Sequence, residues 1–183
     1  MYEVEVKAHL KNREEIKKKL ENFGCVFGEE LHQVDHIFLP KGTVFPPPLQ
    51  VPVLRVRYQN DIYLFTLKLS QTSRTDSIER EIEIKNGEIM IEILNLTGWE
   101  QVTVVDKKRI KTKIEDMEIV LDTVKDLGEF IEAEKIVTDP DNKARVNIQS
   151  ELFNFLETLG VPKEDHIVDG KYDIMTYNQR NNI

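Results

Sequence analysis

The chain has 183 residues, a formal net charge of −8 and a pI near 5.1. Hydrophobic residues make up 40% of it and charged residues 32%, so it is long and apolar enough for one globular domain over residues 1–183. The acidic balance argues against a nucleic-acid partner, because such binding needs a basic surface that neutralises phosphates. No apolar stretch is long enough for a membrane span, the N-terminus has no signal-peptide character, and the single Cys25 excludes an intrachain disulfide, so we expect a cytoplasmic protein.

The first half of the chain predicts one helix among short strands. Residues 2–9 alternate apolar and charged side chains with the period of two that a β-strand has. Asn12 and Glu15 resemble a helix capping box, and the helix that they open ends near Gly24. Further strands are predicted at residues 33–39, 53–59, 62–69 and 77–85, with a proline-rich loop over residues 40–52.

The second half predicts three more strands and three helices. A short helix over residues 87–96 ends before Gly98. A longer helix over residues 141–159 carries an apolar stripe at helical spacing, and a short helix is expected near Tyr172. The strands are predicted at residues 101–114, 117–124 and 129–137.

These eight strands share an unusual distribution of charge. One face of each is apolar, and the other carries blocks of a single sign rather than the mixture typical of a solvated surface. Eight antiparallel strands are enough to close a barrel, and helices cover apolar faces. The sequence therefore predicts an α+β fold, a closed eight-stranded antiparallel β-barrel with a charged tunnel inside and helices packed on the outside.

The two sets of charges inside such a tunnel predict a metal-dependent site for a polyanion. Arginine and lysine bind phosphate oxygens, and clustered carboxylates bind hard cations such as Mg²⁺ or Mn²⁺. Metals that bridge carboxylates to phosphates are typical of phosphoryl or nucleotidyl transfer. The predicted phosphate-binding residues are Lys7, Arg55, Arg57, Lys68, Lys107 and Arg109, and the predicted metal ligands are Glu3, Glu5, Glu81, Glu83, Asp122, Glu132 and Glu134.

In order along nearly the whole chain, these residues resemble the motifs of the CYTH superfamily, the triphosphate tunnel metalloenzymes. The N-terminal segment matches the Glu-x-Glu-x-Lys signature of that family. The matching positions are Glu3, Glu5 and Lys7, then Arg55, Arg57, Lys68, Glu81, Glu83, Lys107, Arg109, Asp122, Glu132, Glu134 and Tyr172. The resemblance implies a barrel that binds a triphosphate and Mg²⁺ or Mn²⁺ in its tunnel, with Lys68, Glu5 and Asp122 as candidate catalytic groups.

Within that family the chain is most similar to the class IV adenylyl cyclase branch. Gln33, Asp35 and Phe38 match a segment of this branch, but Ile37 replaces its tyrosine and Lys171 stands where serine is common. The resemblance implies cyclisation of ATP to cyclic AMP and pyrophosphate. The alternatives are a triphosphatase acting on tripolyphosphate, thiamine triphosphate or a nucleotide, and a non-catalytic polyphosphate- or nucleotide-binding module. The expected partner is a small-molecule triphosphate, with no nucleic acid and no membrane, and a homodimer is compatible with this interpretation.

Overall fold

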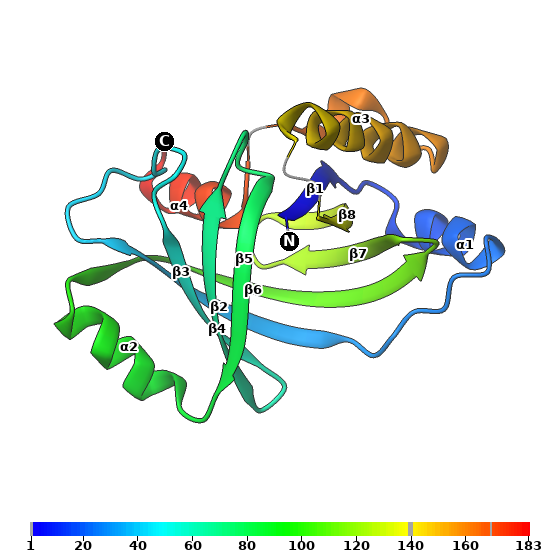
Figure 1. The fold of residues 1–183 in the computed structure, drawn as a ribbon. Helices are drawn as coiled ribbons and strands as arrows, with labels where there is room; N and C mark the ends of the chain where they lie inside the picture. The colour runs from blue at the N-terminus through cyan, green and yellow to red at the C-terminus, as the bar shows by residue number, and fades with distance from the viewer. Residues whose placement is uncertain (1, 139–140, 169) are drawn as a thin grey trace.

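The computed structural model describes residues 2–138, 141–168 and 170–183 (Figure 1). Nearly every predicted element is present, and the boundaries differ by one or two residues. The strands are β1 (Tyr2–His9), β2 (Leu31–Pro40), β3 (Val53–Gln59), β4 (Ile62–Ser70), β5 (Asp76–Ile84), β6 (Trp99–Ile114), β7 (Met117–Val124), β8 (Gly128–Val137) and β9 (His166–Ile167). The helices are α1 (Arg13–Asn22), α2 (Gly87–Leu96), α3 (Asn142–Thr158) and α4 (Tyr172–Asn181), with a 3₁₀ turn at Lys163–Asp165.

The first eight strands form a closed antiparallel barrel in the order β5-β4-β3-β2-β6-β7-β8-β1, and β1 returns to β5. The predicted architecture is therefore confirmed. The two-residue strand β9, which the sequence did not predict, pairs with β1 at Lys7 and Ala8.

Local chemistry sets the ends of these elements. Asn12 accepts a hydrogen bond from the backbone N–H of Glu15 and so caps α1, as predicted. Asn86 caps α2 in the same way. The β3–β4 hairpin turns at Asn60 and Asp61, both with positive φ, as a type I′ hairpin turn requires.

The apolar faces of the strands point outward, as expected. Val4, Val6 and Ala8 of β1 are fully buried in the largest apolar cluster, to which α1 and α3 also contribute. Figure 1 shows α3 lying across β1 and β8, while α2 packs at another corner against β3, β4 and β6. Since the outer faces supply the core, the charged faces are left to line the interior.

The barrel is closed unevenly around its circumference. β1 pairs with β8 along its whole length, from Tyr2 to His9. Its other edge pairs with β5 at three positions only, where Tyr2, Glu3 and Val4 face Ile78, Ser77 and Asp76. We call this short β1–β5 ladder the seam.

Among the described residues, no helix combines the length and the apolar character needed to cross a lipid bilayer.

Candidate active site

The inward faces of the strands enclose one large cavity. It has a volume of about 1150 Å³, counting the part open to solvent. Acidic residues from β1, β5 and β8 and basic residues from β1, β3, β4 and β6 line it. All six predicted phosphate-binding residues are among the lining, namely Lys7, Arg55, Arg57, Lys68, Lys107 and Arg109.

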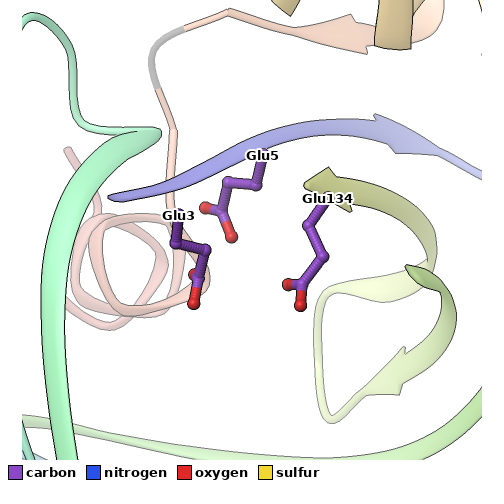
Figure 2. A group of neighbouring side chains, drawn as sticks. All are labelled: Glu3, Glu5 and Glu134. Atoms are coloured by element: carbon purple, nitrogen blue, oxygen red, sulfur yellow. The ribbon is translucent and has the colours of Figure 1, made fainter. Parts of the chain in front are cut away.

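Three of the predicted metal ligands converge on one point (Figure 2). Glu3 and Glu5 project from β1, and Glu134 projects from β8, where it lies opposite Glu5 in the ladder. One carboxylate oxygen from each lies within 4.8 Å of the others. Oxygen ligands at this spacing suit a hard divalent cation. We call Glu3, Glu5 and Glu134 the carboxylate cluster.

The electrostatics of the cluster favour a bound cation. Burial raises the pKa of Glu134 to about 8, and the charges of Glu3 and Glu5 add to the shift. Burial alone would also raise the pKa of Glu3, but Lys68 and then Lys171 outweigh it, so that pKa is lowered. Glu134 therefore lacks a compensating positive charge, and a cation would supply one.

The other predicted metal ligands lie elsewhere. Glu132 lines the cavity, but it contacts Lys7 Nζ at 2.7 Å and accepts a hydrogen bond from Arg109 at 2.6 Å. Glu81 accepts hydrogen bonds from Arg55 at 3.1 Å and Thr66 at 2.7 Å at the exposed side of the cavity.

Asp122 and Glu83 lie outside the cavity lining. Asp122 is fully buried and accepts two hydrogen bonds from the guanidinium of Arg109, at 2.8 and 2.5 Å. Glu83 is exposed near the end of β5, beyond the part of that strand that pairs with β1. The structure thus places Asp122 behind Arg109, a predicted phosphate-binding residue, and Glu83 away from the carboxylate cluster.

Asp35 is a site residue to which the sequence analysis gave no role. It is 4% exposed, and it accepts hydrogen bonds from Arg57 at 2.6 and 2.8 Å. Lys107 Nζ is 3.7 Å from the same carboxylate, and Arg55 is 4.0 Å away. Arg57 and then Lys107 hold the pKa of Asp35 well below its usual range against the effect of burial. The alternation of residues in β2 puts Gln33, Asp35 and Ile37 on one face, and this pattern could have identified Asp35 as a residue of the cavity.

Further charged residues complete the lining. Glu79 forms an ion pair with Lys68, which is also 3.5 Å from Glu3. Lys171, just before α4, lines the cavity together with Tyr172. The ring of Tyr172 lies 4.3 Å from Lys7 Nζ and 5.1 Å from Lys107 Nζ. Lys171 lies outside the strands, directly before α4, so no strand pattern could place it here.

Two of the lysines have unusually low pKa values. Burial lowers the pKa of Lys107 to about 7, and Arg109 adds to this effect. Burial, together with Lys171 and Arg55, lowers the pKa of Lys68 to about 8, although Glu3 opposes the shift. Both amines can therefore gain or lose a proton near neutral pH.

We expect binding of tripolyphosphate to transfer protons to the protein. A bound polyanion favours the charged form of Lys107, so its pKa rises on binding and the site takes up protons between pH 7 and 8. By the same linkage, affinity falls as the pH rises through this range. Calorimetry in two buffers of different ionisation enthalpy measures the uptake. Lys107→Arg is the control, because arginine is always charged and the protonation of the ligand itself cancels in the comparison. Equal uptake by the two proteins would contradict the expectation.

Nearly the whole chain is similar to known proteins. The family model for the CYTH domain matches residues 1–170. The chain belongs to the CYTH family. A Methanocaldococcus jannaschii protein named as a candidate adenylate cyclase is 29% identical over 174 residues, which cover 94% of this chain and 97% of that relative.

Several solved structures share the fold, among them one from Pyrococcus horikoshii and one from Hippeastrum. The PH1012 protein of Pyrococcus horikoshii is 28% identical, with a TM-score of 0.77 over 96% of this chain and 99% of that one. A Hippeastrum protein described as a candidate adenylyl cyclase with a dominant triphosphatase activity is 16% identical, with a TM-score of 0.60 over 98% and 96% of the two chains. At this identity the second comparison shows the fold alone.

Proposed function

We propose that this CYTH protein is a divalent-metal-dependent enzyme that cleaves a phosphorus–oxygen bond of a small-molecule triphosphate. One observation carries the proposal: the carboxylate cluster and six basic residues line the same cavity. A cation site alone or a basic pocket alone would fit many ligands. The two together fit a metal–triphosphate complex, whose negative charges exceed those that the metal neutralises.

In this proposal the acidic and the basic residues of the cavity have different roles. Glu3, Glu5 and Glu134 would hold Mg²⁺ or Mn²⁺, which neutralises charge on the phosphate oxygens when bound. Arg55, Arg57 and Arg109 would bind phosphate oxygens through their planar guanidinium groups and fix the direction of attack. Asp122, the candidate catalytic residue behind Arg109, would act by orienting that guanidinium. Lys68 would supply an amine that exchanges a proton near pH 8.

Cyclisation of ATP is the first candidate reaction. In it the 3′-hydroxyl attacks the α-phosphorus, a new phosphorus–oxygen bond forms, and pyrophosphate leaves with the bridging oxygen. The name of the M. jannaschii relative, which matches nearly the full chain, supports this choice.

Hydrolysis of a terminal phosphate is the second candidate. Water attacks the terminal phosphorus, the bond from that phosphorus to the bridging oxygen breaks, and orthophosphate is released while the remaining diphosphate leaves with the bridging oxygen. Among the described residues that line the cavity there is no Asn or Gln side chain to read the edge of a base, which favours recognition through the phosphates alone. The activity attributed to the Hippeastrum protein agrees with this alternative.

A single assay separates these possibilities. The protein is incubated with ATP, tripolyphosphate or thiamine triphosphate, each with Mg²⁺ or Mn²⁺, and the products are identified by chromatography. Cyclic AMP with pyrophosphate supports the cyclase, and orthophosphate supports the triphosphatase. Binding of a triphosphate without any product, under all these conditions, would refute an enzyme and leave the non-catalytic binding module. Homodimerisation stays a prediction.

A further inference from the structure

The seam is one of the places where acidic and basic residues of the cavity meet. Glu3 and Glu5 lie on β1, and the edge of β1 opposite β8 pairs with β5 only at the three seam positions. Across the seam, β5 pairs with β4, which carries Lys68, and β4 pairs with β3, which carries Arg55 and Arg57. The 3.5 Å contact between Glu3 and Lys68 therefore spans from one side of the seam to the other. A shift of β1 against β5 would change how far the carboxylate cluster lies from Lys68, Arg55 and Arg57.

A buried ion pair from outside the barrel reaches this seam. Asp76 is fully buried at the start of β5, where it faces Val4 of β1. Arg145, on α3, is 2% exposed, and its Nε donates to Asp76 Oδ1 at 2.8 Å. The other oxygen of Asp76 accepts hydrogen bonds from the backbone N–H, at 3.2 Å, and the hydroxyl of Thr72. The guanidinium of Arg145 also lies 4.2 Å from the centre of the Tyr2 ring.

The same helix holds the loop that precedes β5. One turn after Arg145, Gln149 donates hydrogen bonds to Thr75 Oγ1 at 2.8 Å and to Ser73 Oγ at 3.2 Å. The carbonyl of Thr75 in turn accepts from the backbone N–H of Glu5 at 2.9 Å. A continuous path of contacts therefore leads from α3 through residues 73–76 to the backbone of Glu5.

Burial of two charges is costly, and apolar side chains of similar size would often stabilise the fold as well or better. A buried pair instead imposes one geometry, because both partners must keep their hydrogen bonds. We propose that Arg145 is a positioning residue for the metal site: acting through Asp76 and the seam, it fixes Glu3 and Glu5 relative to the phosphate-binding strands. This inference rests on the proposed role of the carboxylate cluster as a metal site.

The test compares metal binding with stability in the full-length protein. Mn²⁺ binding is titrated by calorimetry for wild type, Arg145→Lys and Arg145→Met, at a temperature where thermal melts show each to be folded. Arg145→Lys keeps the charge and removes the planar fork, so it is the milder variant if Arg145→Met does not fold. Loss of such a supporting contact is expected to weaken Mn²⁺ affinity by about tenfold or more in Arg145→Met and by less in Arg145→Lys.

Leu156→Ala supplies the matched control. Leu156 is fully buried on α3 in the apolar cluster, about 16 Å along the helix axis from Arg145. The substitution Leu156→Ala should lower the melting temperature without changing Mn²⁺ affinity. If the Arg145 variants bind Mn²⁺ as the wild type does, or if Leu156→Ala weakens binding equally for the same loss of stability, then Arg145 is structural only and the inference is overturned.

A further variant separates this inference from the proposed function. Glu5→Gln removes one carboxylate of the cluster itself. If wild type binds Mn²⁺ and Glu5→Gln does not, the metal site stands, and the Arg145 variants alone decide the inference. If Glu5→Gln binds Mn²⁺ as tightly as wild type, the cluster is not the metal site, and the proposed function and the inference both fail.

Discussion

Replacing Glu5 by Gln should lower kcat by about 10²-fold or more while the protein stays folded. Glu5 is one of three carboxylates whose oxygens lie within 4.8 Å of one another, and the substitution removes a charge with little change in shape. It also relieves repulsion on Glu134, so the melting temperature without metal should stay the same or rise. Turnover is measured over a range of Mn²⁺ concentrations, and excess metal should restore part of it if affinity is what fell.

The control for this variant is another glutamate changed in the same way. Glu92 is exposed on α2, which packs on the outside of the barrel, and Glu92→Gln should leave kcat, KM and metal dependence unchanged. Loss of activity in Glu5→Gln only in proportion to loss of folded protein would show that the cluster has a structural role and no part in turnover.

Asp35→Ala should destabilise the fold by about 3–5 kcal/mol, the range for breaking a buried ion pair by removing one partner. Asp35 is the anion shared by Arg57, Lys107 and Arg55, and without it these cations repel one another in a buried site. Urea denaturation measures the loss. Tripolyphosphate should stabilise this variant more than it stabilises wild type, because a bound polyanion replaces the missing charge.

Asp106→Ala is the control for Asp35→Ala, since Asp106 is partly exposed and contacts His32 at 2.8 Å on the barrel surface. Its loss should cost no more than about 1 kcal/mol. A small effect of Asp35→Ala, equal to that of Asp106→Ala, would contradict the role of Asp35 as the central counter-charge.

Asp35 should also make the stability of the folded protein depend on pH in the acid range. The pKa of Asp35 in the folded protein lies well below the value of about 3.9 expected for the unfolded chain. Its contribution to stability is therefore complete above that value and is lost as the pH falls toward the folded value. Wild type should lose stability more steeply than Asp35→Ala when the pH is lowered below about 4.

The alternation of residues predicted which way the side chains of each strand point. Glu3 and Glu5 face inward and Val4 and Val6 outward, because the period of two is a property of the strand itself. The same rule put Glu83 on the inner face, but it could not show that β5 extends past the seam, so that Glu83 ends in solvent.

Pairings between strands were harder to predict than the direction of side chains. Whether an inward acid meets a cation or another acid depends on register, which is set by turns and by packing distant in sequence. Glu134 faces Glu5 and joins the cluster, whereas Glu132, two residues earlier, faces Lys7. Asp35 faces Arg57 for the same reason, and only the register of β2 against β3 reveals it.

The uneven closure of the barrel also bears on the order in which the protein folds. β1 is near the start of the chain, and both of its main partners, β5 and β8, lie far along it. Contacts between such distant segments carry a large loop-closure cost and form late. The carboxylate cluster is one of these contacts, so a metal bound there stabilises the folded protein more than the transition state and slows unfolding rather than hastening folding. A divalent metal held by the cluster would therefore lengthen the lifetime of the folded molecule.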